Sequence, residues 1–485
     1  MNRTFLSNLI LLISINLLIK PFYIFGIDRT VQNRVGLEDY GLYATLFSFT
    51  FLFQIINDFG IQSFNNRNIA QYPHLLPKYF PNLLILKVGL GVVYSLFTVG
   101  VAYLLGFGEK HYSILLFFIF NQILISAIFF FRSNISGLGY YRVDSLVTIL
   151  DRSLLIFICS ILLWTNLVTG PFQIEWFVYA QSVSLLVTAA IAFLFIYRKL
   201  PSFKCQFHAA FLVLMLKKSY PYALAIFLMT LYTRIDFVMI ERLLGDGERE
   251  AGIYASAYRL LDAVNVLGLL FSGLLLPMSA RLLKEKQSIR PILRLSLKLI
   301  LCIAIITSFS VFFFRNDIMF LLYEDTSFYA ANILGILMFT FIFTSGIYVY
   351  GTILTANNSL KTLNKIFTVS VLLNIVLNFL FIPKYGALGA AGVTFFTQGF
   401  AFICQILTAK KIFRLSIDLK LLGQFLLLGI TLSGLSLMFI KFALFDWISN
   451  FFMVVLLGVG ASFLLNLLKV SDFLNLLRTT EGRNK

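Results

Sequence analysis

The sequence predicts an all-α protein that crosses a membrane about fourteen times. Of its 485 residues, 59% are hydrophobic and only 13% are charged, and the mean hydropathy is +0.89. A soluble chain carries roughly 25% charged residues, because its surface must be wettable. The apolar residues also form long continuous runs, which a membrane β-barrel with its alternating pattern would not show. The spans are therefore predicted to be helices.

Each apolar run is long enough to supply about 20 residues of spanning helix. In chain order the predicted spans are residues 5–26, 41–63, 83–105, 113–131, 145–165, 176–197, 220–241, 253–277, 295–314, 330–355, 366–382, 387–409, 421–441 and 447–468. The first run follows only Arg3 and has no small-residue cleavage site behind it, so we expect a retained span and not a removed signal peptide. No connection is long enough for a soluble catalytic domain of ordinary size.

Basic residues set the predicted orientation. An even number of spans places both termini on one side of the membrane. Lys and Arg collect in connections on that side, such as residues 198–218 and 281–294, whereas Asp246, Glu248 and Glu324 lie on the other side. The positive-inside rule then puts both termini in the cytoplasm. We therefore attribute the net charge of +17 to basic residues that set the orientation in the membrane. We expect no nucleic-acid partner, because no basic segment is long enough for a binding domain.

An internal repeat predicts how the spans are grouped. Gly41-Leu42-Tyr43 aligns with Gly252-Ile253-Tyr254, and the same separation places Lys87 on Lys298. Six spans separate the two copies, so they share one topology, and such parallel repeats indicate two lobes with a substrate cavity between them. The predicted organisation is an N-lobe (1–200, spans one to six), a cytoplasmic linker (201–219), a C-lobe (220–412, spans seven to twelve), and spans thirteen and fourteen with a cytoplasmic tail (413–485).

Several segments carry a resemblance to a known family. Residues 33–43 (NRVGLEDYGLY), 252–261 (GIYASAYRLL) and 385–392 (YGALGAAG) resemble the polysaccharide-transporter branch of the multidrug/oligosaccharidyl-lipid/polysaccharide (MOP) exporter superfamily, which includes the Wzx-type O-antigen repeat-unit flippases. The resemblance implies a V-shaped, two-lobed bundle in a bacterial inner membrane that alternates between inward-open and outward-open states.

The same resemblance implies the cargo, an oligosaccharide repeat unit on undecaprenyl diphosphate. It implies a polysaccharide polymerase and a chain-length regulator as partners, besides the membrane lipids. O-antigen of lipopolysaccharide and capsule stay open as the product, and a lipid II flippase or a multidrug antiporter of the same superfamily is the alternative. Spans thirteen and fourteen favour lipid-linked cargo, because drug-exporting relatives usually have twelve spans.

Polar side chains inside the spans are the candidate site residues, because a charge at mid-helix costs about 2.5–3.5 kcal/mol on insertion scales. On span eight, Arg259, Asp262 and Asn265 follow a spacing that places them on one face. The repeat maps this face onto a polar stripe of span two that includes Gln54 and continues to Asp58. We expect both faces to line a hydrated cavity, where the Arg259 guanidinium offers a bidentate donor to diphosphate. The alternative is that Arg259 and Asp262 only pair with each other.

Further candidates lie in spans one and seven. Lys20 and Arg234 are candidate contacts to phosphate, and each equally fits a role in bracing a kink or pairing with an acid. Asp58, Asp236 and Asp262 are candidates for coupling transport to protons or sodium ions, because ionisable groups inside membranes mark ion pathways. We expect no catalytic residue, no cofactor and no metal site, since the Cys and His residues are scattered without ligand spacing.

Other charges have structural interpretations. Lys87 and Lys298 are predicted to snorkel to the cytoplasmic face, and Glu241 is predicted to be solvated at the outer end of span seven. Asp151 and Arg152 fit a neutralised local pair as well as a site.

Two enzyme classes are alternatives of a different kind. A membrane glycosyltransferase would need acids that bind a metal or a nucleotide sugar, usually on a large aqueous loop, and the chain has neither a DxD motif nor such a loop. A polysaccharide polymerase would be expected to carry a long outer loop, whereas the outer connections here are about 15 residues at most. A transporter is therefore the preferred interpretation.

Overall fold

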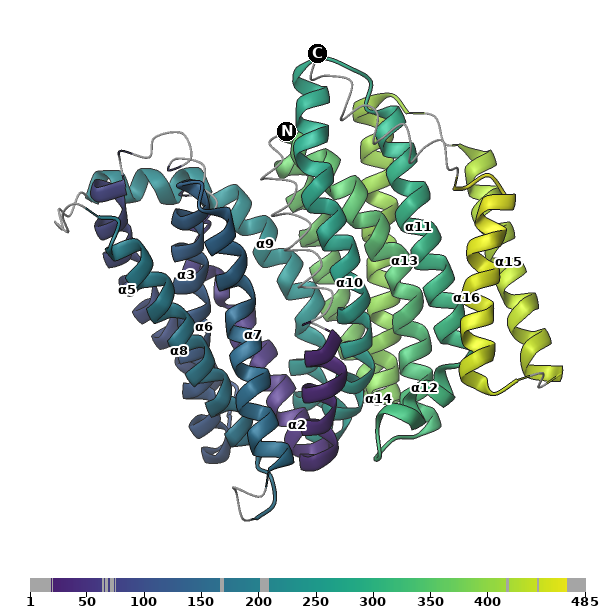
Figure 1. The fold of residues 1–485 in the computed structure, drawn as a ribbon, viewed down its shortest axis with the longest axis horizontal. Helices are drawn as coiled ribbons and strands as arrows, with labels where there is room; N and C mark the ends of the chain where they lie inside the picture. The colour runs from purple at the N-terminus through teal and green to yellow at the C-terminus, as the bar shows by residue number, and fades with distance from the viewer. Residues whose placement is uncertain are drawn as a thin grey trace. The chain divides into compact units, whose positions relative to one another are not determined.

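The computed structural model describes residues 19, 21–62, 65, 69, 74, 76–165, 170–200, 209–415, 418–442 and 445–468. These residues form helices joined by short connections, and no strand occurs among them (Figure 1). Eleven of the described helices are long and apolar enough to cross a membrane. The predicted all-α polytopic architecture is confirmed. Of predicted span one, residue 19 and residues 21–26 are described, and the rest lies outside the described residues.

The chain divides into two compact units, Met1–Gly252 and Ile253–Lys485. The described helices of the first unit are η1 (Phe22–Asp28, a π-helix), α2 (Arg29–Leu52), α3 (Gln54–Asp58), α5 (Leu76–Leu104), α6 (Glu109–Gly137), α7 (Tyr141–Trp164), α8 (Ile174–Tyr197), α9 (Ala209–Leu243) and the first residues of α10 (Gly247–Lys284). Within this unit α6 packs on α8, α8 on α7, and α2 on α9. The predicted lobes and linker, drawn from the repeat, stay a prediction.

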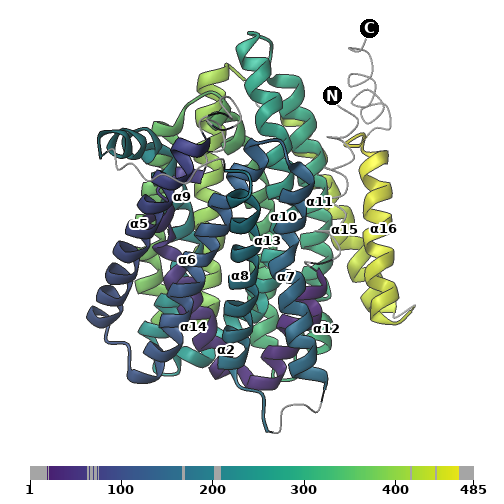
Figure 2. The ribbon, with the colours of Figure 1, turned by 60° about the vertical axis from the view of Figure 1, so that its left-hand side comes forward.

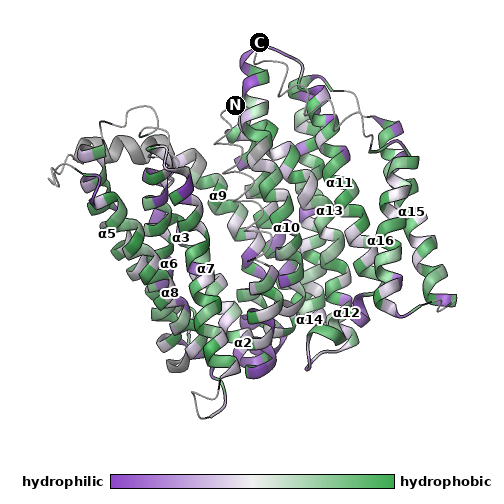
Figure 3. Cartoon of the chain, viewed as in Figure 1, coloured by the Kyte–Doolittle hydropathy of each residue, from purple (hydrophilic) through white to green (hydrophobic). Residues whose placement is uncertain are grey.

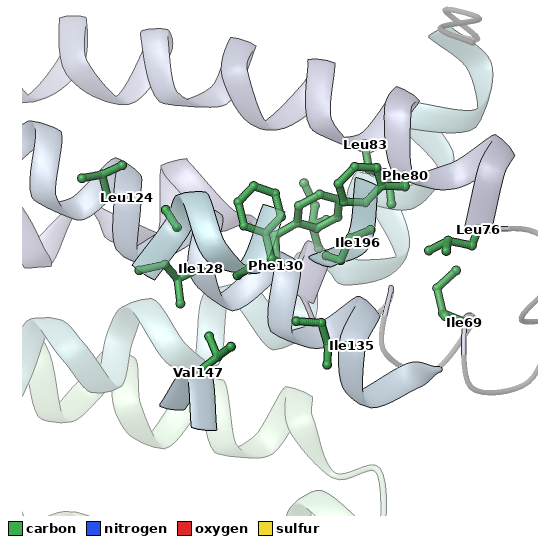
Figure 4. Packing of buried hydrophobic residues seen from close by; sticks show 14 of the residues in the cluster. Ile69, Leu76, Phe80, Leu83, Leu124, Ile128, Phe130, Ile135, Val147 and Ile196 are labelled. Carbon is green, nitrogen blue, oxygen red and sulfur yellow. The ribbon is translucent and has the colours of Figure 1, made fainter. Parts of the chain in front are cut away.

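Aromatic and aliphatic side chains from α5, α6 and α8 form a core of the first unit. Figure 4 shows Phe80 of α5 against Phe130 of α6, with Ile196 of α8 beside them. The Phe80 and Phe130 rings are stacked, with centroids 5.4 Å apart. Both side chains are fully buried, so this cluster holds the three helices together while leaving their other faces for lipid.

The second unit contains the rest of α10, α11 (Arg290–Phe313), α12 (Arg315–Leu322), α13 (Phe328–Ala356), α14 (Leu360–Phe413), α15 (Leu419–Phe442) and α16 (Trp447–Leu464). Here α11 packs on α13, and α15 and α16 pack on each other and on α11 (Figure 2). Predicted spans eleven and twelve are both in α14, which continues through Gly386 at φ +59° and ψ −142°. Two spans meet there without a loop, because glycine tolerates this backbone conformation.

The outer surfaces of the helices are apolar. Figure 3 shows hydrophobic residues along most of each helix and hydrophilic residues mainly toward helix ends and connections. Large side chains such as Leu96, Phe157 and Leu456 are more than 60% exposed. Single exposed apolar residues are normal in soluble proteins, but continuous apolar helix faces are typical of contact with lipid.

Equivalent positions of the internal repeat make equivalent side-chain hydrogen bonds. Tyr43, on α2, accepts a hydrogen bond from Gln181 Nε2 of α8 at 2.8 Å in the first unit. Its repeat equivalent Tyr254, on α10, shares a 3.4 Å hydrogen bond with Thr394 Oγ1 of α14 in the second unit. Both phenols are buried and both partners lie on the sixth span of their own repeat. The repeat therefore aligns two tyrosines that connect equivalent helices by a hydrogen bond.

Helix α2 meets the first turns of α10 at the two glycines that the repeat aligns. A Cβ built on Gly41 would lie 1.7 Å from the carbonyl oxygen of Glu248, and a Cβ on Gly252 would lie 2.0 Å from that of Leu37. The two backbones therefore touch, which only glycine permits at both positions. All four residues belong to the first unit.

Candidate functional site

A break in predicted span two creates the candidate site. Helix α2 ends at Leu52, Phe53 has φ −93° and ψ 4°, and the five-residue helix α3 follows. At its end Phe59 and Gly60 adopt positive φ values of 49° and 79°. A helix end leaves its last carbonyls without intrahelical partners, so the Asn57 carbonyl is open to side-chain donors from neighbouring helices.

Lys87 of α5 supplies the central charge of this site. Its ammonium lies 2.6 Å from Asp58 Oδ1, donates to the Asn57 carbonyl at 3.2 Å, and also donates to Ser126 Oγ of α6. An ammonium has three donors, and each has an acceptor here. The Lys87 side chain is 6% exposed and that of Asp58 is 23% exposed. The lysine is thus enclosed, while its carboxylate partner is partly accessible.

Two amides extend the network to α6. Asn57 Nδ2 and Gln54 Nε2 both donate to the backbone carbonyl of Gln122, at 3.1 and 3.0 Å. The Ser126 hydroxyl donates in turn to the Asn57 carbonyl at 3.2 Å. The short helix α3 is therefore held to α5 by an ion pair and to α6 by hydrogen bonds. We call the residues of this network the α3 cluster: Gln54, Asn57, Asp58, Lys87, Gln122 and Ser126.

The prediction that Lys87 snorkels is wrong. Snorkelling assumes that the side chain must reach water to stay charged, but the break after Leu52 brings Asp58 and a helix-end carbonyl against it. Its repeat equivalent Lys298 differs, since its ammonium donates to the Asn466 carbonyl at 3.1 Å and it is only half-buried. The sequence alignment did not reveal this difference in environment.

Of the predicted site residues, the structure brings Gln54 and Asp58 together in the α3 cluster. Arg234 is half-buried and Asp236 is fully buried on α9. Lys20 lies outside the described residues. The predicted continuous stripe from span two to Asp58 is interrupted, because Phe53 separates α2 from α3.

The predicted face of span eight lies on α10 in the second unit. Arg259, Asp262 and Asn265 are all half-buried there. Asn265 Oδ1 accepts a hydrogen bond from Thr344 Oγ1 of α13 at 2.9 Å, so this amide also bridges two helices. The three residues lie on one helix, and the prediction that their shared face lines a hydrated cavity stays a prediction.

Several charged groups outside the predicted set are also enclosed. The prediction that Glu241 is solvated is wrong, since its side chain is 7% exposed and lies 2.7 Å from Arg242 Nε and 3.7 Å from His111 Nε2. The Arg242 guanidinium lies 3.8 Å from the Phe107 ring centroid, which covers the pair from one side. The contact depends on the packing of α9 against the α5–α6 connection, which local sequence does not reveal.

Two more charged contacts lie near η1. Buried Asp28 accepts a 2.7 Å hydrogen bond from Tyr40 of α2; it was not among the predicted site residues. Arg152 lies 3.7 Å from Asp151, as the local-pair interpretation predicts, and its guanidinium also lies 4.7 Å from the Tyr23 ring centroid. Among the described residues, no group of three His, Cys, Asp or Glu side chains could hold a metal ion.

Comparison with known families decides the classification. The family model described as "Polysaccharide biosynthesis protein" matches residues 5–283, more than half of the chain. The chain belongs to this family. A second model, MatE, matches residues 221–380, and the two matches together support membership of the chain in the MOP exporter superfamily. Comparison with curated protein sequences finds no match.

Solved structures share the fold of this family member. An inward-facing multidrug resistance MATE family transporter of the MOP superfamily is 14% identical, with a TM-score of 0.66 over 81% of this chain and 94% of that one. The lipid II flippase MurJ in an inward closed conformation is 16% identical, with a TM-score of 0.66 over 93% and 98%. A mutant of the Vibrio cholerae MATE transporter VcmN is 16% identical, with a TM-score of 0.57 over 84% and 98%. The chain is therefore a multi-pass membrane protein with a transporter fold.

Proposed function

We propose that this protein is a flippase for an undecaprenyl-diphosphate-linked oligosaccharide, an O-antigen or capsule repeat unit. It moves the lipid-linked sugar from the cytoplasmic to the outer leaflet of the bacterial inner membrane by alternating access. The observation that carries the proposal is the family match, because the polysaccharide biosynthesis model covers residues 5–283. Both termini are cytoplasmic in this proposal, with a polymerase and a chain-length regulator as partners.

The last two spans support lipid-linked cargo over a soluble drug. The match to the lipid II flippase covers 93% of this chain, whereas the matches to the MATE transporters cover 81% and 84%. Helices α15 and α16 add a further apolar pair to α11. A long hydrocarbon tail has more apolar surface to bury than a small soluble drug has.

In this proposal the basic and amide side chains bind the cargo and the acids respond to ions. Arg259, Arg234 and Lys20 contact the diphosphate, while Gln54 and Asn265 contact sugar hydroxyls. Asp58, Asp236 and Asp262 couple the cycle to protons or sodium. Asp58 is suited to this, because its partly exposed carboxylate neutralises the enclosed Lys87, and loss of its charge leaves a buried ammonium without an ionic partner.

Deletion of the gene tests the proposal. We expect carrier-linked repeat units to accumulate in the cytoplasmic leaflet, where they stay inaccessible to a glycosidase added outside spheroplasts. Normal exposure of the repeat unit outside would overturn the flippase proposal. Restored growth of a strain depleted of its lipid II flippase would point to lipid II as cargo, and lowered dye accumulation in cells expressing the chain would point to drug export.

Replacement of Arg259 tests its binding role. We expect Arg259→Ala to abolish surface polysaccharide with unchanged protein abundance, because a lost guanidinium–phosphate contact costs about 1.5–3 kcal/mol, or more than tenfold in affinity. Arg281→Ala is the matched control on the same helix, since Arg281 is exposed and pairs with Glu285 four residues away. Normal polysaccharide in the Arg259 variant would remove this residue from the binding site.

A further inference from the structure

A histidine at the start of α6 lies against two glutamates from the end of α9 and the start of α10. His111 Nε2 is 3.4 Å from Glu248 Oε1 and 3.7 Å from Glu241 Oε1. The side chains of His111, Glu241 and Glu248 are 14%, 7% and 34% exposed, and all three residues belong to the first unit. The imidazole is therefore enclosed between one buried acid and one that reaches solvent.

Arg242 supplies a fixed positive charge beside this histidine. Its Nε lies 2.7 Å from Glu241 Oε2, and a terminal guanidinium nitrogen donates to the carbonyl oxygens of Leu105 and Gly106 at 3.3 and 3.5 Å. The guanidinium also lies against the ring of Phe107. Because a guanidinium stays charged at every pH that a protein meets, Arg242 holds the end of α9 to the α5–α6 connection independently of pH.

His111 supplies a second charge that depends on pH. Its ring lies edge-on to Phe107, with centroids 5.3 Å apart, and neither of its nitrogens has a hydrogen-bond partner in the described part of the chain. Histidine side chains gain their charge between about pH 5 and pH 8, and both nitrogens of an imidazolium are donors. Protonation therefore gives Glu248 an ionic partner that the neutral imidazole does not offer.

The charged groups that face the imidazole carry a surplus of negative charge. Among the described residues these are Glu241 and Glu248, with Arg242 paired to the first; Asp246 and Arg249 in the same connection are exposed. Two carboxylates and one guanidinium leave one negative charge, which an imidazolium neutralises. A charge in an enclosed place is costly without a partner. The contact is therefore stabilised at low pH, and this stabilisation is lost as the pH rises and His111 loses its proton.

The contact lies next to the crossing of α2 and α10. Glu248 is in the first turn of α10, and its carbonyl oxygen is the atom that Gly41 of α2 approaches. In the predicted organisation His111 belongs to the N-lobe and both glutamates belong to the C-lobe, with their connections on the outside. Alternating access moves one lobe against the other, so this contact has to open before the transporter can open to the outside.

We propose that His111 and Glu248 form a pH-dependent latch at the outer face of the transporter, supported by the fixed pair of Arg242 and Glu241. At low external pH the imidazolium binds Glu248 and keeps the outer face closed. As the pH rises, the neutral imidazole releases Glu248 and the outer face opens more readily. This inference rests on the proposed alternating access and does not depend on the identity of the cargo.

Distances between two spin labels on the full-length protein in lipid nanodiscs test the proposal. The labels are attached to Leu104→Cys and Asp246→Cys, two exposed positions at the end of α5 and before α10, after the four native cysteines are replaced by alanine. Pulsed electron paramagnetic resonance measures the short-distance and long-distance populations at about pH 5.5, where glutamates are still ionised, and at about pH 8. We expect the ratio of short to long distances to be about fivefold higher at the lower pH, the effect of one partly exposed ion pair.

Variants of the latch separate its parts. His111→Gln, which has no charge at either pH, should show the high-pH ratio throughout, whereas His111→Lys, which is always charged, should show the low-pH ratio throughout. Glu248→Gln should remove most of the pH response, and the fold should tolerate it because this side chain is partly exposed. The matched control is His74→Gln, since His74 is exposed and lies in a predicted cytoplasmic connection; its pH response should equal that of the native chain.

A pH response that persists in His111→Gln would overturn the proposal, as would a native chain whose distances do not change with pH. Loss of the response in His74→Gln would overturn it too, because the pH sensor would then lie elsewhere. These measurements contain no cargo. Normal outside exposure of the repeat unit after gene deletion, which would overturn the flippase proposal, would therefore leave the distance results unchanged.

Discussion

At the scale of single residues, the α3 cluster shows how a charge is kept inside an apolar bundle. Burying an ion costs several kcal/mol, and the cost is offset only when opposite charge and hydrogen bonds replace water. Lys87 has both, with Asp58 at 2.6 Å and the Asn57 carbonyl at 3.2 Å. Removing either charge should therefore be more harmful than removing both.

Asp58→Asn should lower the free energy of unfolding by about 3–5 kcal/mol, because it leaves the enclosed Lys87 ammonium without an ionic partner. Lys87→Met should have a smaller effect, because the Asp58 carboxylate is partly exposed and water can solvate it. Thermal unfolding in detergent, followed by near-UV circular dichroism, measures both. A stable Asp58→Asn variant that fails to restore surface polysaccharide would assign the acid to coupling. Equal stability of the two single variants and of the variant that carries both substitutions would show that the pair has no structural role.

The sequence predicted the candidate site only in part, for reasons visible at these residues. Gln54 and Asp58 are predictable because a polar residue in a span is costly, a rule that needs no tertiary structure. The contacts of Lys87 are not predictable from the sequence, because they depend on the break at Phe53 and the left-handed Phe59 and on the packing of α3 against α5 and α6. Glu241 was misread for the same reason, since its neighbour His111 comes from a distant helix.

At the scale of elements, glycines determine where helices touch and bend. Gly41 and Gly252 let the backbones of α2 and α10 meet, and Gly386 lets α14 continue through a bend. The sequence located both regions, in the repeat and in the small-residue run that begins at Gly386. The backbone conformations of these glycines could not be predicted from composition, because glycine adopts many combinations of φ and ψ.

Gly41→Ala should destabilise the protein by about 1–3 kcal/mol or more, because the new methyl group would meet the Glu248 carbonyl and force the helices apart. Gly252→Ala should destabilise the protein in the same way, because its methyl group would meet the Leu37 carbonyl. Gly89→Ala is the control, as a Cβ there meets nothing within 4 Å and alanine favours the helix. The midpoint of thermal unfolding is the measurement, and an unchanged midpoint in Gly41→Ala would contradict the close crossing.

Gly386→Ala should cost about 1–3 kcal/mol, because its φ and ψ lie near a region that residues with a side chain avoid. Gly392→Ala, six residues later in the same helix, has open space around its Cβ and no positive φ. Comparing protein yield and thermal midpoint of the two variants separates backbone strain from loss of space. Equal behaviour would mean that the backbone conformation at residue 386 carries no strain for a residue with a side chain.

At the scale of the whole molecule, the membrane explains why the fold class was predictable. Lipid requires every spanning backbone to form its own hydrogen bonds, so composition and run length are enough to predict helices. Thirteen of the predicted spans map onto described helices, from α2 to α16. An apolar cavity of about 810 Å³ in the second unit was not predicted, because its walls come from four separate helices, α11, α13, α14 and α15.

Removal of residues 413–485 should leave an inserted protein without polysaccharide export. Helices α15 and α16 bury Leu428, Leu432 and Val454 in a cluster with Ile305 of α11, and the α11 surface they uncover is apolar and compatible with lipid. Membrane fractionation with immunoblotting and surface polysaccharide staining measure the two effects. Removal of residues 469–485 alone is the control, and full export without the helix pair would show that it is dispensable for cargo.

The meeting of α2 and α10 has a consequence for the origin of the chain. Gly41 faces residue 248 and Gly252 faces residue 37, and the repeat aligns 37 with 248 as it aligns 41 with 252. The contact is isologous, the kind that two identical subunits make across a two-fold axis. A six-span ancestor that paired with its own copy would have needed only one glycine and one carbonyl to form it. Alanines at both glycines should cost less than the sum of the two single substitutions, because they open one shared interface.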